Sequence, residues 1–208
     1  MVNQGIVVPY LEYENLAKSA DGIIAEHHPS RQLPIPVEEI IDTGLHIDVF
    51  PLPGLTKALA DNGVVAFVNS SLDLITVDHD AWESSTPRYR FSIAHELGHI
   101  VLHKAVFAQL KVESLEEWKQ AMKSIPKEQY ARLEWQANAF AGHLLVPTTE
   151  LRANLDAYVE EIEKSGLDPR NEAVRPFVEK HLGGVFRASS PVIHIRLDRE
   201  GLWSELIA

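Results

Sequence analysis

The chain has 208 residues, and 45% of them are hydrophobic, which is enough for one packed domain with at most a small appendage. It contains no cysteine, which excludes disulfides, thiolate metal ligands and a thiol nucleophile. A formal net charge of −11 argues against nucleic acid as the main partner, because an acidic surface repels phosphate backbones, although it permits a basic protein partner and also serves solubility.

The sequence predicts a cytoplasmic protein without a membrane anchor. Residues 1–16 contain no basic residue and no sustained apolar run, so they do not resemble a secretory signal. No run of about 18 apolar residues occurs, so no segment is expected to span a membrane. The lack of cysteine also fits a reducing compartment.

The first part of the chain is predicted to form two helices and a small sheet. Apolar residues at helical spacing predict helices over residues 10–28 and 37–43. Short apolar or alternating runs predict strands over residues 45–50, 64–68 and 72–77, with a turn at 69–71. Pro51 is expected to end the first strand, and the polar stretch 78–85 is expected to be a loop.

The rest of the chain is predicted to be helical, so the expected fold class is α+β with segregated strands. Thr86-Pro87 provides an N-cap and a first helical position for a helix that reaches about His103. Further helices are predicted over residues 114–123, 126–146, 149–164, 171–182 and 190–199. Gly183-Gly184 is expected to end the fourth of these, and the fifth is expected to be the last. We therefore expect one domain, residues 1–208, with a helical C-terminal subregion, residues 149–208.

The motif His95-Glu96-Leu97-Gly98-His99 lies in the predicted helix that starts at Pro87, and its spacing is that of a zinc hydrolase. Residues four apart share one face of a helix, so the two imidazoles can bind one ion at about 2.1 Å each. Glu96 can reach a water at the metal without being a ligand, which makes it the candidate general base. The flanking residues are apolar and predict a buried helix, where unpaired polar groups are costly. This favours a metal site over the alternative of solvated histidines.

His103 is not a suitable third ligand for the same ion. It follows His95 by eight residues on one helix, which separates them by about 12 Å along the axis. The metzincin spacing also fails, because Leu102 and Ala105 occupy the positions where it requires glycine and histidine. The third ligand must therefore come from a second element, and His103 is interpreted as a core, surface or cleft residue.

Glu134 is the best candidate for the third ligand. It lies in an apolar helical segment whose small residues Ala137 and Ala141 would let a second helix pack closely. Asn138, one turn further on, is placed to bond a ligand histidine or to orient Glu134. The spacing alone also permits an alternative, in which Glu134 is an exposed helix residue without a role in metal binding. Two other residues of the same helix compete as third ligands, His143 and Glu128.

Two stretches of the sequence resemble the ImmA/IrrE family of metallopeptidases. They are Tyr89–His103, with its His-Glu-Leu-Gly-His core, and Glu134–Pro147, with Glu-x-x-Ala-Asn at its start. The segment before the first predicted strand, residues 35–37, and the C-terminal segment, residues 186–202, also resemble this family. The resemblance therefore extends over most of the chain. The departures are conservative substitutions, serine for the common threonine at Ser92 and valine for the common methionine at Val146.

The resemblance implies a gluzincin-like minimal zinc peptidase, in which the His-Glu-x-x-His helix packs on a small sheet of about three strands. In this family the corresponding glutamate is the third zinc ligand, which assigns that role to Glu134. The family also implies a substrate class, namely helix-turn-helix transcriptional repressors that are cut to relieve repression.

The predicted chemistry is peptide-bond hydrolysis with zinc, or with manganese as an alternative metal. A zinc ion held by His95, His99 and Glu134 would bring the pKa of water at the metal toward about 7. Glu96 would take the proton and deliver it to the leaving amine. The developing oxyanion needs a further donor. The candidates for this donor are Tyr130, His103 and Arg90. Arg90 is equally suited to a structural ion pair.

Two other functions remain open on the sequence. An inactive metallopeptidase-like module could bind and sequester a regulator or an antitoxin, but such a module would not need Glu96. The stretch Ala173–Gly201, with Arg187, Arg196 and Arg199, could be a helix-turn-helix that reads DNA. The net charge and the shortness of this stretch favour a helical pair that closes the core. The prediction is therefore a zinc endopeptidase that acts on a repressor protein, with neither a membrane nor DNA as a direct partner.

Overall fold

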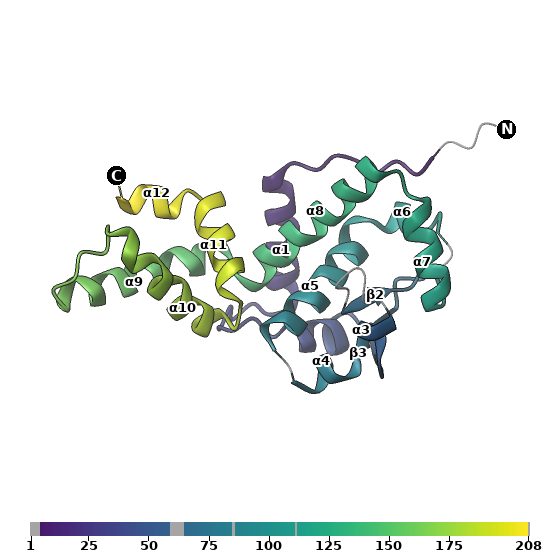
Figure 1. The fold of residues 1–208 in the computed structure, drawn as a ribbon, viewed down its shortest axis with the longest axis horizontal. Coiled ribbons are helices and arrows are strands. Elements are labelled where there is room, and N and C mark those ends of the chain that lie inside the picture. The colour runs from purple at the N-terminus through teal and green to yellow at the C-terminus, as the bar shows by residue number, and fades with distance from the viewer. Residues whose placement is uncertain (1–4, 59–64, 85, 111, 208) are drawn as a thin grey trace.

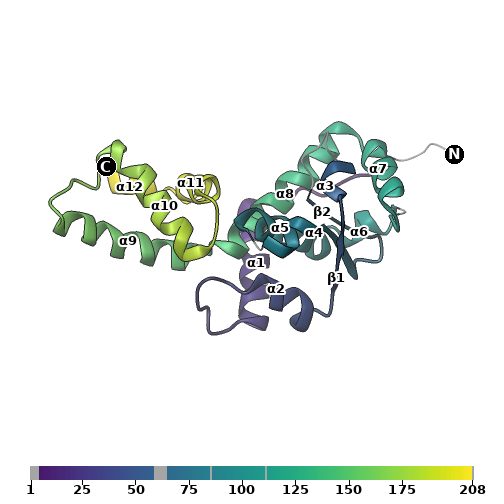
Figure 2. The ribbon, with the colours of Figure 1, turned by 60° about the horizontal axis from the view of Figure 1, so that its bottom comes forward.

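The computed structural model describes residues 5–58, 65–84, 86–110 and 112–207 (Figure 1). These residues form an α+β fold that is mostly helical and has one small sheet, which confirms the predicted fold class. The sheet and most of its covering helices make up one end of the molecule. The last helices of the chain lie together at the other end, as the ribbon shows in two orientations (Figures 1 and 2).

The sheet is mixed and has the strand order β1-β3-β2, where β1 is Asp48–Leu52, β2 is Ala66–Val68 and β3 is Leu74–Asp78. β1 runs parallel to β3, and β2 pairs with β3 in the antiparallel direction. The three predicted strands are present, although predicted residue 64 lies outside the described residues. The expectation that Pro51 ends the first strand is wrong, because β1 is an edge strand and an edge tolerates a residue without an N–H.

The helices before the sheet agree with the prediction. α1 spans Tyr13–His27, and its buried residues Leu16, Ala20 and Ile24 recur at helical spacing. α2, Val37–Glu39, continues as a π-helical turn over Ile40–Gly44, and a short α3, Leu55–Ala58, lies between β1 and β2.

The polar stretch after β3 forms the helix α4, His79–Ser84, and the predicted loop is wrong there. The carboxylate of Asp78 accepts a hydrogen bond from the backbone N–H of Ala81 at 3.3 Å, so it caps the first turn. The same carboxylate accepts from the backbone N–H of Thr56 at 2.8 Å and thereby joins α3 to the end of β3. An aspartate N-cap was the local signal for this helix.

The central helices are α5, Pro87–Leu102, and α8, Lys127–Leu145, with the shorter α6, Lys104–Phe107, and α7, Leu115–Ser124, between them. Both predicted N-caps are present. The hydroxyl of Thr86 accepts from the backbone N–H of Tyr89, and the hydroxyl of Ser114 accepts from that of Glu117, each at 3.3 Å. α5 packs on α8 and on β2, and α1 covers another side of α8 (Figure 1).

The C-terminal helices are α9, α10, α11 and α12, which span Thr148–Lys164, Arg175–Phe186, Ser190–Arg199 and Leu202–Ile207, with a short 3-10 turn at Glu172–Val174. Two boundary predictions are wrong here. Gly183 lies inside α10, where a Cβ would stand only 2.9 Å from the carbonyl oxygen of Ala188, so this glycine permits a close contact and does not end the helix. The helix ends at Phe186, and its C-cap Arg187 has a positive φ of 49°. α12 follows the helix that was predicted to be the last.

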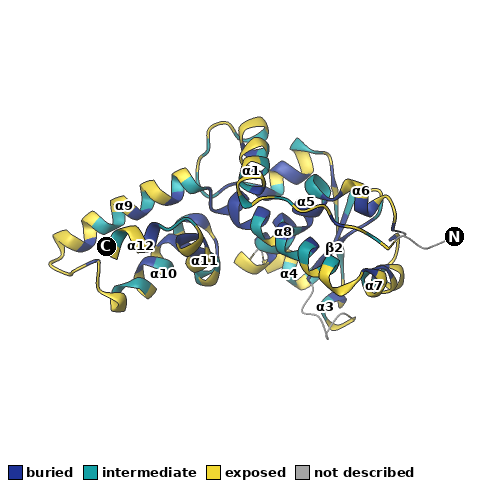
Figure 3. Ribbon diagram, turned by 90° about the horizontal axis from the view of Figure 1, so that it is seen from above, coloured by how far each residue is buried: buried dark blue, intermediate teal, exposed yellow. Residues whose placement is uncertain are grey.

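Burial concentrates in the centre of the molecule (Figure 3). α5 and α8 carry most of the buried residues of the long helices, whereas α9 buries only Leu151, Leu155 and Ile162 along one side. No helix in the part of the chain that the structure describes is long and apolar enough to cross a membrane.

Candidate active site

α5 is held in the core by its apolar side and presents two histidines beside α8. Ile93, Ala94 and Leu97 are completely buried, so packing fixes the rotation of the helix about its axis. His95 and His99 then project from one face, with their Nε2 atoms 3.0 Å apart. The sequence spacing therefore produces a convergent pair in the folded chain.

α8 approaches α5 closely at the level of this pair. A Cβ at Gly98 would lie 3.1 Å from Cα and 3.2 Å from the carbonyl oxygen of Ala137, which is tighter than ordinary van der Waals contact. Ala137 and Ala141 are completely buried in the same region. Small residues on both helices thus permit the close packing that brings a side chain of α8 to the histidines.

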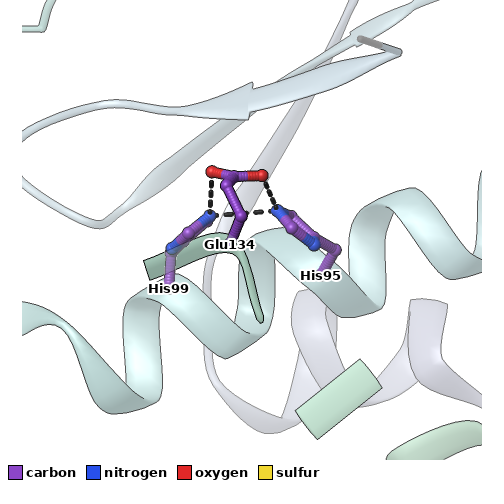
Figure 4. A group of neighbouring side chains, drawn as sticks. All are labelled: His95, His99 and Glu134. Carbon is purple, nitrogen blue, oxygen red and sulfur yellow. Dashed lines mark hydrogen bonds and ion pairs between the residues drawn. The ribbon is translucent and has the colours of Figure 1, made fainter. Parts of the chain in front are cut away.

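Glu134 is the side chain that α8 brings to the pair (Figure 4). Its Oε2 lies 3.4 Å from Nε2 of His95, and its Oε1 lies 3.6 Å from Nε2 of His99. One ligand atom from each of the three residues lies within 4.8 Å of the others, so they could hold one metal ion. Two imidazoles and a carboxylate are the donors of catalytic sites that leave a position for water. Neither of the competing ligands, Glu128 and His143, belongs to this group.

The electrostatics of the three residues suit a cation. Burial raises the pKa of Glu134, but the adjacent imidazoles of His95 and His99 outweigh this effect and hold the pKa well below the usual range. Burial lowers the pKa of His99 to about 4. Burial lowers that of His95 too, but the nearby carboxylates of Glu134 and Glu96 raise it overall. A charged carboxylate and a neutral His99 are ready to bind metal without losing a proton.

Glu96 is buried beside the group and is not one of its three members. Burial raises the pKa of Glu96 to about 8, and the charge of Glu134 adds to this, whereas His95 and the backbone N–H of Val68 lower it. Val68 is the last residue of β2, so Glu96 lies between the histidine helix and the edge of the sheet. A carboxyl group with a raised pKa is suited to accept and release a proton near neutral pH.

Asn138 and Tyr130 lie on α8, one turn on either side of Glu134. Oδ1 of Asn138 lies 3.0 Å from Nδ1 of His95, the ring nitrogen that does not face Glu134. Burial raises the pKa of Tyr130 to about 12, and the charges of Glu134 and Glu96 add to this rise. The Tyr130 hydroxyl therefore stays protonated near neutral pH within the field of the two carboxylates.

His103 and Arg90 do not face the group. His103 is 1% exposed and lies behind His99, with the two Nδ1 atoms 3.0 Å apart. Arg90 donates to the carboxylate of Glu38 at 2.8 Å and to the carbonyl oxygen of Ile35 at 2.6 Å. The ion pair that was the alternative interpretation of Arg90 is therefore present, and it ties α5 to the segment around α2.

Sequence reasoning missed a cavity of about 730 Å³ between α5, α8 and α11. Its lining includes Phe91 of α5, Trp135 and Asn138 of α8, and Val192 and Ile195 of α11. Asn138 also contacts His95, so the cavity adjoins the candidate metal group. The contribution of α11 has no signal in the sequence, because it depends on how the C-terminal helices fold back against α8.

The helix α5 and its two histidines indicate the class of protein. One class of metallopeptidases takes two metal ligands from histidines four residues apart on a helix and a general base from the glutamate after the first histidine, and α5 carries these residues at this spacing. Residues 81–198, which make up more than half of the chain, match the family model of peptidase M78, the IrrE N-terminal-like domain. The chain belongs to this family, as the resemblance to ImmA/IrrE peptidases predicted. Comparison with the curated proteins gives no match.

Proposed function

We propose that the chain is a zinc-dependent endopeptidase in which His95, His99 and Glu134 hold the metal and Glu96 is the general base. The observation that carries the proposal is the position of Glu134, which converges from a second helix on the two histidines beside the buried Glu96. The donors are nitrogen and oxygen atoms, which suit zinc and also manganese. When bound, the metal supplies a Lewis acid that polarises the scissile carbonyl and activates water.

The residues of the chain then have separate roles in hydrolysis. Glu96 takes one proton from the attacking water and delivers it to the leaving amine as the peptide bond breaks. Asn138 holds the ring of His95 through Nδ1 and leaves Nε2 free for the metal. Tyr130, whose raised pKa keeps its hydroxyl protonated, donates a hydrogen bond to the oxyanion that develops on the carbonyl.

The proposed substrate is a helix-turn-helix transcriptional repressor, and cleavage relieves repression. The net charge of −11 suits a basic, DNA-binding protein as the partner. The apolar side chains of Trp135, Val192 and Ile195 in the adjoining cavity suit a hydrophobic segment of the substrate. A repressor as substrate also requires that the enzyme work in the cytoplasm.

Direct DNA binding by the C-terminal helices is not part of the proposal. Arg196, one of the cations proposed for a DNA-reading helix, is 2% exposed. Its guanidinium donates to Glu200, Thr148 and the carbonyl oxygen of Val146. Arg196 therefore connects α11 to the end of α8 inside the protein.

The proposal is tested by incubating the zinc-loaded protein with the repressor encoded beside its gene. Glu96→Gln removes the proton acceptor, so we expect repressor cleavage to fall by at least about 100-fold while zinc content is unchanged. A Glu96→Gln protein that cleaves as fast as the wild type would contradict the assignment. A variant that fails to cleave but still relieves repression in full would instead support sequestration of the regulator.

A further inference from the structure

A chain of hydrogen bonds runs from the metal group to the N-terminal segment of the protein. Nδ1 of His99 lies 3.0 Å from Nδ1 of His103, and Nε2 of His103 lies 2.8 Å from Oε1 of Gln136. Nε2 of Gln136 donates to the carbonyl oxygen of Pro9 at 2.8 Å. The three side chains are buried, with exposures of 4%, 1% and 0% for His99, His103 and Gln136.

The carbonyl of Pro9 sets the direction of every bond in this chain. A carbonyl oxygen only accepts, so the NH₂ group of Gln136 must face Pro9 and its Oε1 must face His103. Oε1 also only accepts, so Nε2 of His103 carries the hydrogen. A neutral imidazole has one N–H, which leaves Nδ1 of His103 as an acceptor, and Nδ1 of His99 must then donate to it.

The consequence falls on the other nitrogen of His99. With its hydrogen on Nδ1, His99 has a lone pair on Nε2, the atom that lies 3.6 Å from Glu134 and 3.0 Å from Nε2 of His95. We propose that His103 and Gln136, anchored on the carbonyl of Pro9, are positioning residues that hold His99 in the tautomer required to bind the metal. This inference rests on the metal site of the proposed function and adds a cause for its preorganisation.

The anchor itself is held on α8 at neighbouring positions. Gln129 accepts a hydrogen bond from the backbone N–H of Val8 at 2.7 Å, and Arg132 donates to the carbonyl oxygen of Val8 at 2.9 Å. Val8 is completely buried. The segment before α1 is therefore fixed along α8, and the position of Pro9 does not depend on the bond to Gln136 alone.

The direct test is ¹⁵N NMR of the histidine rings in the metal-free protein, together with zinc affinity from competition with a chelator. In the wild type we expect the Nδ1–H tautomer for His99 and the Nε2–H tautomer for His103. The opposite pair of tautomers would overturn the proposal. This measurement needs neither a variant nor activity, so it separates the tautomer relay from the peptidase function.

The variant Gln136→Met keeps the volume of the side chain and removes both of its hydrogen bonds. We expect its zinc affinity to fall roughly 10- to 100-fold and the His99 signal to become a mixture of tautomers. Gln109→Met, the same substitution at an exposed glutamine of the loop after α6, should match the wild type in both measurements. Unchanged tautomers and zinc affinity in Gln136→Met would refute the relay. A wild type that binds zinc with the expected tautomers but cuts no repressor would refute only the proposed function.

Discussion

At the scale of single residues, Glu134 is the side chain that could complete a metal site with the two histidines of α5. Its carboxylate spans both imidazoles, and no other described carboxylate belongs to the group. Nε2 of His95 and Nε2 of His99 alone would offer two ligands, which is fewer than catalytic zinc sites use. Glu134 therefore links the pattern on α5 to a complete donor set.

Replacing Glu134 by alanine should release the metal. We expect the zinc affinity of Glu134→Ala to fall by at least about 100-fold, because a direct ligand contributes more than the residues that orient ligands. Metal analysis of the purified protein after dialysis measures the effect. Glu128→Ala, at an exposed position of the same helix, is the control and should retain zinc. Full zinc retention by Glu134→Ala would rule out this third ligand.

A second single residue, His143, contributes to the pH dependence of stability. Burial and the charge of Arg196 lower its pKa to about 4 from the ordinary value of 6.5, although Glu200 opposes this. The unfolded chain therefore binds a proton below pH 6.5 that the folded protein excludes. The stabilisation by neutral His143 is present above pH 6.5 and is lost as the pH falls to about 4, which corresponds to about 3 kcal/mol.

The variant His143→Gln should remove this part of the pH dependence. Glutamine keeps an acceptor near Arg196 but does not titrate. Between pH 7 and pH 4, we expect the free energy of unfolding to fall by about 3 kcal/mol less in the variant than in the wild type. Denaturant titrations of the metal-free proteins at several pH values measure the difference. If the free energy of unfolding changed equally with pH in the two proteins, His143 would not contribute to the pH dependence of stability.

At the scale of elements, the distance between α5 and α8 controls the site. Gly98→Val places a branched side chain against the backbone of Ala137, which cannot move without shifting α8. We expect a loss of about 1–3 kcal/mol in the free energy of unfolding and a lower zinc affinity, because Glu134 moves away from the histidines. Thermal unfolding and chelator competition test the two effects separately.

The control for Gly98 is a helical glycine that contacts nothing. Gly22 lies in the exposed part of α1, and a Cβ there would have no neighbour within 4 Å. Gly22→Ala should raise the free energy of unfolding by roughly 0.5–1 kcal/mol and leave zinc affinity unchanged. If Gly98→Val were as stable as the wild type, the close approach of the two helices would not be needed.

At the scale of the whole molecule, α11 brings the C-terminal helices close to the candidate metal group. Pro191, Val192 and Ile195 of α11 line the cavity together with Trp135 of α8. Ile195 is 57% exposed, although it is a large apolar residue in a helix that otherwise buries its apolar side. The two ends of the molecule thus form one apolar recess beside the candidate metal group.

A charge in this recess should weaken substrate binding without disturbing the metal. We expect Ile195→Glu to raise KM for the repressor about tenfold while kcat and zinc content stay near wild-type values. Phe177→Glu is the control, since Phe177 is 65% exposed on α10 and does not line the cavity. Equal KM values for the two variants would show that the recess does not take part in substrate binding.

Much of this protein follows from the sequence because its signals are local. The spacing of His95 and His99, the Thr86 cap and the apolar positions of α1 and α8 each act within a few residues, so each determines its element directly. The three strands and the α+β class follow for the same reason. The predicted loop is wrong over residues 79–84, because Asp78 is a local cap that starts α4.

Tertiary structure decided what depends on contacts between distant segments. Which of Glu134, Glu128 and His143 lies beside the two histidines depends on the packing of α8 on α5, because all three lie on one helix but at different levels and on different faces. The bond from Pro9 to Gln136 and the recess completed by α11 join positions that no periodicity relates. A local pattern orients a side chain about its own helix, but only the packing of helices sets which side chains meet.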